Sequence, residues 1–412
     1  MKSVTVSTTI SDLAADTVSV VRKDMRMERK TVAILGATGS VGAQALDVAR
    51  ARNYRVDLLV ANTDAVAMER AVREFSPKAA VMANEAAARE LKLRLSDTDC
   101  RVLSGEGGIC EAISASEANT VVNAVLGKAG LLPTLATLRA GKRLALANKE
   151  SLVIAGDIVT SLARECGVEI IPVDSEHSAI FQSLKAGKRS EIKRLILTAS
   201  GGPFYGKSRE ELSRVTLAYT LAHPTWKMGK KITVDSATLM NKGFEVIEAA
   251  HLFGVSAEKI EVVVHRESIL HSAVEYVDNT VIGELSVPDM RMCVQYAVDY
   301  PHRFEATGDS LDLFSVGALS FARPDTDAFP LLALAGRAMT DGGAMPAVVN
   351  AADETAVEAF LNEKIKFSHI SDLVIATYER MTRWHSETSL EGILCADGEA
   401  RAICGELIDK IN

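Results

Sequence analysis

Leu35-Gly36-Ala37-Thr38-Gly39-Ser40-Val41-Gly42 joins a short β-branched run (31–35) to an amphipathic stretch (42–52). Glycines three residues apart let a strand turn tightly into a helix, and they let the backbone approach a pyrophosphate at the helix N-terminus. The hydroxyls of Thr38 and Ser40 can add hydrogen bonds. An ordinary turn with Ser40 as the helix N-cap is the alternative, but the strand–turn–helix context favours a dinucleotide site.

Outward from this loop, β-branched runs alternate with amphipathic stretches as far as residue 173. This alternation is typical of a Rossmann-like, doubly wound parallel sheet with helices on both faces. We predict strands at Thr31–Leu35, Arg55–Val60, Ala79–Met82, Thr120–Val125, Arg143–Ala147 and Glu169–Val173. We predict helices at Gly42–Arg52, Asp64–Phe75 and Leu131–Ala140.

The pattern changes beyond Pro172. Segment 194–202 resembles a strand that ends in a glycine turn, and segments 260–265, 271–277 and 281–287 alternate like an antiparallel meander. The predicted fold is therefore α/β, with a central α+β catalytic domain after the first sheet and a C-terminal helical bundle. The expected parts are a disordered tail (1–29), a cofactor domain (30–173), a catalytic domain (174–301), a linker (302–327) and the bundle (328–412).

Composition excludes several classes of protein. A chain of 412 residues favours two or three domains, and a net charge of −8 disfavours unspecific binding to nucleic acid or anionic lipid. The six cysteines are scattered without a CxxC pair, which indicates reduced, mostly buried thiols. Neither a membrane span nor a signal peptide is indicated, so we expect a cytoplasmic protein.

Three carboxylates stand out. Asp174 and Glu176 follow a predicted strand, and they point to the same side if the strand geometry persists. If a helix begins near Asn241, Glu245 lies one turn further along, on the same face as Asn241 and Lys242. Each fragment alone could be a solvated turn or a surface ion pair, but an all-oxygen set suits Mg²⁺ or Mn²⁺.

Other polar segments line up with these carboxylates. Lys149 follows a strand of the first sheet, where it could polarise a carbonyl or simply begin a helix. Ser200, before two glycines, could bind an anion or belong to a plain turn. Trp226 lies in a loop rich in Pro, Gly and Lys, which indicates a mobile lid rather than a core tryptophan.

The end of the second strand, Asn62-Thr63-Asp64, should lie near the adenosine ribose. An acid there disfavours a 2′-phosphate, unless Asp64 caps the following helix and turns toward its own backbone. In that case Asn62 and Thr63 would bind the phosphate, and Arg52 or Arg55 could add positive charge. These residues by themselves do not support NADPH.

The motifs together resemble one family. LGATGSVG, LANKESLV, PVDSEH, SGGPF, HPTWKMG, KITVDSATLMNKG followed two residues later by Glu, and PDMR occur in this order. The chain from Lys30 onward is similar to the 1-deoxy-D-xylulose 5-phosphate reductoisomerases. The resemblance implies a homodimer that converts this ketose phosphate to 2-C-methyl-D-erythritol 4-phosphate with NADPH and one divalent cation (Mg²⁺ or Mn²⁺, with Co²⁺ as a further option), in non-mevalonate isoprenoid synthesis.

The resemblance also implies roles for individual residues. The metal ligands would be Asp174, Glu176 and Glu245. The catalytic and substrate-binding residues would be Lys149, Ser175, Ser200, His223, Ser236, Asn241, Lys242 and Glu245, with Trp226 and Met228 in the lid. The cofactor contacts would be Thr38, Gly39, Ser40, Val41, Asn148, Glu150 and Gly229.

Two other functions remain open at this stage. A metal-independent dehydrogenase of the glucose–fructose oxidoreductase type also places a lysine after a late strand, but it leaves the three carboxylates without a role. A non-enzymatic, nucleotide-sensing Rossmann protein would bind the cofactor without turnover. Semialdehyde dehydrogenases are disfavoured, because no cysteine here stands in a suitable nucleophilic setting.

Overall fold

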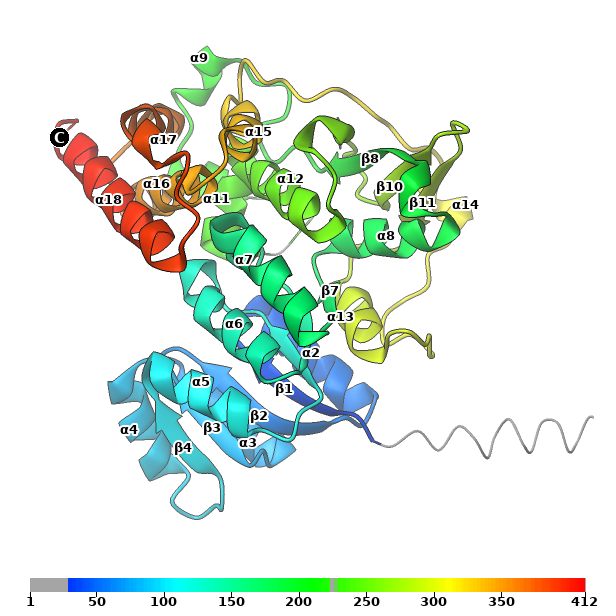
Figure 1. Ribbon diagram of the computed structural model, residues 1–412, viewed down its shortest axis with the longest axis vertical. Helices are drawn as coiled ribbons and strands as arrows, with labels where there is room; N and C mark the ends of the chain where they lie inside the picture. The colour runs from blue at the N-terminus through cyan, green and yellow to red at the C-terminus, as the bar shows by residue number, and fades with distance from the viewer. Residues whose placement is uncertain (1–28, 223–225, 227, 412) are drawn as a thin grey trace, which may run out of the picture.

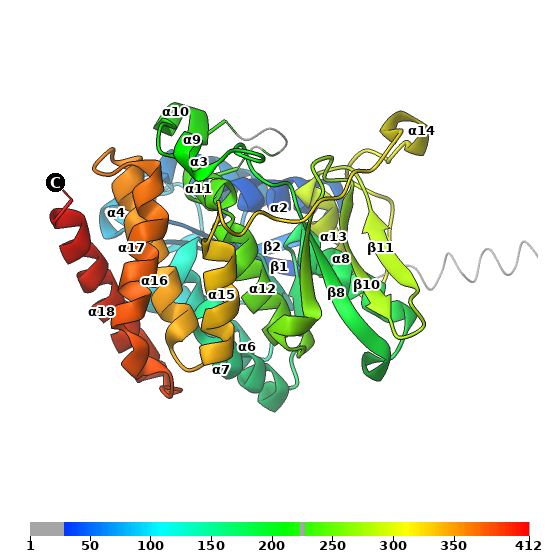
Figure 2. The same cartoon turned by 90° about the horizontal axis from the view of Figure 1, so that it is seen from above.

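The computed structural model describes residues 29–222, 226 and 228–411. The predicted disordered tail lies outside these residues, apart from Arg29. The N-terminal sheet and its helices form one part of the molecule, and a second sheet and the C-terminal helices form the rest (Figure 1, Figure 2). Among the described residues, no helix is both long and apolar enough to span a membrane.

The N-terminal sheet is parallel and doubly wound, as the sequence predicts. Its order is β4-β3-β2-β1-β5-β6-β7, so the winding reverses between β1 and β5. Six of its strands were expected; β4 was not, because its four residues are exposed or half-buried and show no apolar run. The strands are β1 (Thr31–Leu35), β2 (Arg55–Ala61), β3 (Ala79–Met82), β4 (Arg101–Ser104), β5 (Thr120–Asn123), β6 (Arg143–Leu146) and β7 (Ile170–Pro172).

Helices connect these strands, as parallel pairing requires. The first helix begins at Ser40 rather than Gly42, so Ser40 is not the N-cap residue that one alternative assumed. The helices are α2 (Ser40–Ala51), α3 (Ala65–Phe75), α4 (Glu85–Arg94), α5 (Gly105–Ala115), α6 (Leu131–Arg139) and α7 (Glu150–Cys166), with a short 3-10 turn, η1 (Gly127–Gly130), after β5.

The second sheet has the order β11-β10-β8-β9, and it corrects the predicted meander. β10 (Leu270–Tyr276) pairs antiparallel with β8 (Ile192–Ala199) and with β11 (Val281–Leu285). β9 (Ile260–Val264) instead runs parallel to β8 at the opposite edge. The helices between β8 and β9 carry the chain back to the start of the sheet, so these two strands form a crossover pair that period-two alternation cannot reveal.

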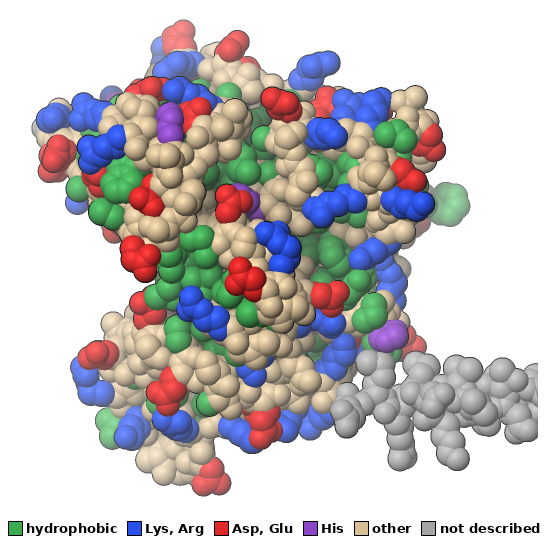
Figure 3. Space-filling model, viewed as in Figure 1, with side chains coloured by type: hydrophobic (Ala, Val, Ile, Leu, Met, Phe, Trp, Pro, Cys, Tyr) green, Lys and Arg blue, Asp and Glu red, His purple; other side chains and the backbone are tan. Residues whose placement is uncertain are grey.

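The helices around this sheet share a core with the C-terminal bundle and with α6 and α7. The helices of this core are α8 (Ser175–Ser183), α9 (Arg209–Leu212), α10 (Leu217–Thr220), α11 (Lys230–Thr238), α12 (Met240–Phe253), α15 (Leu331–Asp341), α16 (Met345–Leu361), α17 (Phe367–Arg380) and α18 (Leu390–Asp409). The short helix that precedes α15, α14 (Leu313–Val316), has no buried residue. The face seen in Figure 3 narrows between the N-terminal part and the rest, and hydrophobic side chains show along this waist.

One helix crosses back to the first domain. α13 (Met290–Asp299) packs Val294, Ala297 and Val298 into the core that also holds α2. Lys30 donates to the carbonyl oxygen of Val298 at 2.6 Å. The domain boundaries remain a prediction. Residues 290–299 lie within the range predicted for the catalytic domain, but they pack on the cofactor domain.

The thiols are less buried than expected. All six cysteines are free, but only Cys293 and Cys404 are buried, while Cys166 and Cys395 are exposed. Cysteine is small enough for either a core or a surface position of a helix. The sequence therefore did not show that Cys166 on α7 and Cys395 on α18 are exposed.

Candidate active site

A cavity of about 860 Å³ lies where the carboxyl ends of the parallel strands face the second sheet. It joins the glycine loop, the three carboxylates and the tryptophan segment, which are far apart in sequence. Of the residues predicted for the site, those that line it are Gly39, Ser40, Val41, Lys149, Glu150, Asp174, Ser175, Glu176, Ser200, Trp226, Met228, Gly229, Ser236, Asn241, Lys242 and Glu245. Thr38 and Asn148 do not line it, and His223 lies outside the described residues.

The glycine loop is packed closely enough to hold a diphosphate. A Cβ on Gly36, whose φ is +82°, would overlap the carbonyl oxygen of Ala124, and a Cβ on Gly42 would overlap that of Gly36. Gly39 is the N-cap of α2 and supplies no side-chain cap. The amides of the first turn are therefore left for an anion, so the loop fits a dinucleotide.

At the ribose end, Asp64 caps α3 by accepting from the amide of Ala67 at 2.8 Å. This confirms the capping alternative. Arg52 and Arg55 were wrongly placed near the ribose. Arg52 pairs with Asp299 at 3.3 Å, and Arg55 begins β2, opposite the end at which Asn62 lies, so both are one strand length away.

Glu150 lines the cavity beside the cofactor loop, and Asn148 lies behind it. Asn148 is buried, and its amide donates to the carbonyl oxygens of Val125 at 2.8 Å and Gly127 at 2.9 Å, and to Glu150 at 2.9 Å. Burial raises the pKa of the Glu150 carboxyl above its usual value. Asn148 thus fixes the turn after β5 from behind the cavity wall.

The three predicted metal ligands come together. Each of Asp174, Glu176 and Glu245 offers a carboxylate oxygen, and these atoms lie within 4.8 Å of one another. The expectation that strand geometry persists through Asp174 and Glu176 was wrong. β7 ends at Pro172, Asp174 is the N-cap of α8, and Glu176 lies in its first turn, which directs both carboxylates into the cavity. Glu245 lies on α12, as predicted.

Two ammonium groups bridge these carboxylates. Lys149 lies 2.6 Å from Asp174 and 3.0 Å from Glu245, and Lys242 contacts Glu245 and lies 2.8 Å from Glu176. Three carboxylates against two lysines leave one negative charge in excess. Burial, and next the charge of Glu176, raise the pKa of Glu245 to about 7. Burial alone would also raise the pKa of Glu176, but the charge and hydrogen bond of Lys242, the hydrogen bond of Ser175 and the charge of Lys149 together outweigh it and hold that pKa well below its usual range. An oxygen-only, electron-rich cluster of this kind fits a divalent cation.

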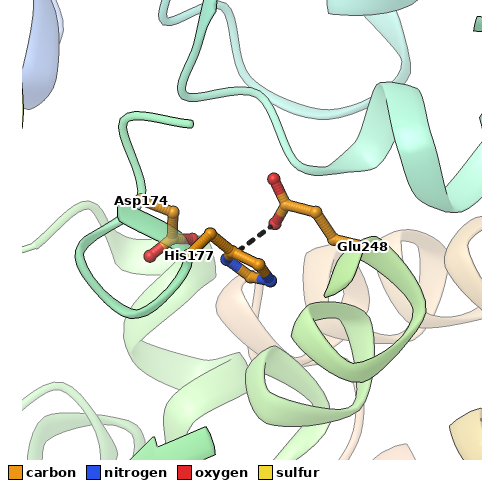
Figure 4. Close-up of side chains that lie close together, drawn as sticks. All are labelled: Asp174, His177 and Glu248. Carbon is orange, nitrogen blue, oxygen red and sulfur yellow. Dashed lines mark ion pairs between the residues drawn. The ribbon is translucent and has the colours of Figure 1, made fainter. Parts of the chain in front are cut away.

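A neutral pair lies behind the carboxylates, and the sequence reasoning missed it (Figure 4). His177 and Glu248 are both fully buried, with His177 Nδ1 3.3 Å from Glu248 Oε2. Because a carbonyl oxygen only accepts, His177 Nε2 donates to the backbone oxygen of Glu245 at 2.9 Å. Burial lowers the pKa of His177 to about 4 and raises that of Glu248. The spacing of Glu248, three residues after Glu245 on one helix face, was the available signal.

Hydroxyl and amide groups surround the excess charge. Asn241 Nδ2 donates to Glu245 at 2.5 Å and Asn241 Oδ1 accepts from Lys149 at 2.8 Å, while Ser175 donates to Glu176 at 2.5 Å. Ser200 lies in the turn after β8, which approaches α11 so closely that a Cβ on Gly202 would lie 2.5 Å from the carbonyl oxygen of Ser236. The turn and α11 can therefore hold one anion between them.

The tryptophan segment borders the same cavity. Trp226, Met228 and Gly229 line it, and the Trp226 ring lies 6.3 Å from the ring of His271. His271, in contrast, is buried and contacts the backbone oxygen of Ser286 at 3.2 Å. Trp226 is half-buried at the cavity rather than part of a core.

Comparison with known proteins gives a consistent answer along the chain. Models of the family match as "1-deoxy-D-xylulose 5-phosphate reductoisomerase" over residues 32–156, as its C-terminal domain over 170–253, and as "DXP reductoisomerase C-terminal domain" over 285–403. The reductoisomerase of Acetivibrio thermocellus is 49% identical over 380 residues, covering 92% of this chain and 99% of that protein. That of Caldanaerobacter subterraneus subsp. tengcongensis is 48% identical over 375 residues, covering 90% and 97%.

Solved structures agree. The Zymomonas mobilis reductoisomerase in complex with NADPH is 41% identical, with a TM-score of 0.86 over 92% of this chain and 99% of that one. A DOX-P reductoisomerase in complex with NADPH, fosmidomycin and magnesium is 39% identical, with a TM-score of 0.88 over 93% and 99%. The similarity covers both sheets and the helical bundle.

Proposed function

We propose how the residues of the cavity divide the reaction, from the premise that the chain belongs to the 1-deoxy-D-xylulose 5-phosphate reductoisomerase family. The protein is an NADPH-dependent oxidoreductase and isomerase that converts this ketose phosphate to 2-C-methyl-D-erythritol 4-phosphate in isoprenoid synthesis, with a divalent metal. One observation carries the assignment: a single cavity holds both a dinucleotide loop and a cluster of three carboxylates.

Asp174, Glu176 and Glu245 hold the divalent cation. When bound, it supplies Lewis-acid stabilisation of negative charge on the substrate's carbonyl oxygen. Mg²⁺ is the ion in the related solved structures, and we propose that Mn²⁺ also serves, because both take oxygen ligands. Lys149 and Lys242 offset the negative charge of the three carboxylates and hold them close together.

Ser200, Ser236, Asn241 and Lys242 bind the phosphate end of the substrate. The positions of these residues support this role, because the turn after β8, α11 and the start of α12 meet in the cavity. The segment that contains Trp226, Met228 and Gly229 covers the bound substrate and excludes water. Phosphate binding energy can favour that closure, because it is available far from the reacting carbons.

Gly39, Ser40 and Val41 hold the diphosphate of NADPH at the start of α2. Because Asp64 is a helix cap, Asn62 and Thr63 are the side chains available to the 2′-phosphate. Thr38 and Asn148 act through the loop's shape, which their positions outside the cavity lining support.

The working protein is a cytoplasmic homodimer. β11 is an edge strand, and Val281 and Leu285 on it are 53% and 40% exposed. Phe314 in the linker is 99% exposed. An apolar edge strand and a protruding aromatic side chain favour a second copy as partner.

Metal-dependent turnover tests the proposal. We expect the protein to oxidise NADPH with 1-deoxy-D-xylulose 5-phosphate, to lose that activity in EDTA, and to regain it with Mg²⁺ or Mn²⁺. Turnover that survives EDTA would favour the metal-independent dehydrogenase. Cofactor binding without turnover would favour the nucleotide sensor.

A further inference from the structure

The C-terminal helices form part of the cavity wall, although the sequence motifs quoted above all lie before them. Glu354 of α16 and Leu394 and Arg401 of α18 line the cavity. Asp353 and Glu354 are neighbours on α16, yet they contact two different parts of the molecule. This arrangement places one helix between the substrate side and the cofactor side.

Asp353 contacts the substrate side. Lys231 Nζ lies 2.9 Å from Asp353 Oδ2 and 2.6 Å from Asp235 Oδ2, and both carboxylates are buried. Lys231 and Asp235 both belong to α11, and Asp235 directly precedes Ser236. Asp353 therefore holds the helix that presents Ser236 to the cavity.

Glu354 contacts the cofactor side. Its Oε1 accepts from the backbone amide of Lys128 at 3.3 Å, and its Oε2 accepts from Arg401 at 2.6 Å. Arg401 lies 3.0 Å from Asp397, which in turn lies 2.5 Å from Lys128 Nζ. The side chains of Glu354, Arg401, Asp397 and Lys128 thus form a row of alternating charge, and Glu354 also accepts from the backbone of Lys128 in the η1 turn.

The η1 turn borders the dinucleotide loop. It follows β5, and Ala124, the residue directly after that strand, is in contact with Gly36, while Gly127 and Lys128 line the cavity together with Gly39. A Cβ on Gly127 would lie 2.6 Å from Glu354 Oε1, so the carboxylate lies directly against the turn. Any shift of Glu354 would be transmitted to the wall of the cofactor site.

We infer that Asp353 and Glu354 are positioning residues, Asp353 for the substrate half of the cavity and Glu354 for the NADPH half. The inference rests on the proposed function, and it assigns to the C-terminal bundle a share in ligand binding. Neither carboxylate belongs to the cluster of Asp174, Glu176 and Glu245. Their effect on the affinity for each ligand can therefore be measured separately from turnover.

Calorimetric titration with NADPH and, separately, with 1-deoxy-D-xylulose 5-phosphate in the presence of Mg²⁺ tests this division. Glu354→Ala should raise the Kd for NADPH roughly three- to tenfold, the loss expected for one or two hydrogen bonds, and leave the Kd for the ketose phosphate within about twofold. Glu354→Gln should restore part of the affinity, because its amide oxygen can still accept from Lys128. Asp353→Asn should show the opposite selectivity.

Glu399→Gln is the matched control. Glu399 lies on the neighbouring helix α18 and accepts from Trp384 Nε1 at 3.1 Å, but it does not line the cavity, so both Kd values should stay unchanged. Equal weakening of both ligands, or a lower melting temperature with unchanged Kd values, would assign Asp353 and Glu354 a purely structural role. A wild-type protein that binds neither ligand would refute the proposed function and this inference together.

Discussion

Replacing Glu245 by glutamine removes one negative charge from the carboxylate cluster with little change of shape. In the present structure the cluster has three carboxylates and two ammonium groups, so Glu245→Gln leaves Asp174 and Glu176 balanced by Lys149 and Lys242. The metal-free protein should therefore fold normally, with a melting temperature close to that of the wild type.

The same change should weaken metal binding strongly. The ligand oxygens lie within 4.8 Å of one another, and unit charges 4 Å apart interact by about 4 kcal/mol at an effective dielectric constant of 20. Because solvent screens part of this interaction, we expect the variant to lose about 2.7 kcal/mol of Mg²⁺-binding free energy, or about 100-fold in affinity for Mg²⁺.

The test compares the wild type with the Glu245→Gln variant. Activity is measured against Mg²⁺ concentration, and Mg²⁺ binding is measured by calorimetry. Glu399→Gln serves again as the control, because it removes a carboxylate of the same chain outside the cavity. A wild-type dependence on Mg²⁺ in the Glu245→Gln variant would refute the assignment of Glu245 as a ligand. Loss of the fold in the metal-free variant would refute the charge balance.

Other perturbations address the lid, the cofactor and the buried histidine. Trp226→Ala should lower kcat more than about tenfold while the melting temperature stays within a few degrees, and a large fall in melting temperature instead would place Trp226 in the core. The ratio of kcat/KM for NADPH and NADH should favour NADPH by a reduced margin, since Asn62 and Thr63 supply no charge; equal values would show that Asp64 faces the ribose. Because burial lowers the pKa of His177 to about 4, proton uptake favours the unfolded chain as the pH falls from about 6.5 to 4. Metal-free protein should lose about 3 kcal/mol of stability over that window, and a His177→Gln variant, which cannot bind the proton, should show a correspondingly smaller loss in urea unfolding.

The sequence predicted the first sheet well because its strands are buried on both faces and therefore read as continuous apolar runs. β4 escaped notice because an edge strand of four residues has no such run. β9 was assigned to the wrong neighbour, since period-two alternation reports which face is buried and not which strand pairs with which.

The candidate site was predictable as far as its motifs reach. Asp174, Glu176 and Glu245 were found as a set, although α8 rather than a continued strand orients the first two. Contacts between distant segments could not be found in this way. Asp353 and Glu354 stand in an alanine-rich helix and become meaningful only when α16 is packed against η1 and α11.

The return of α13 to the first sheet affects how the protein can be divided into fragments. A fragment that stops at residue 173 would omit Val294, Ala297 and Val298, and so would expose the apolar side of α2, including Val48 and Ala49. It would also remove Asp299, the partner of Lys30 and Arg52. To cover α2, such a fragment would require residues 290–299 to be fused behind residue 173 by a short linker, since this core is built from two separate pieces of the chain.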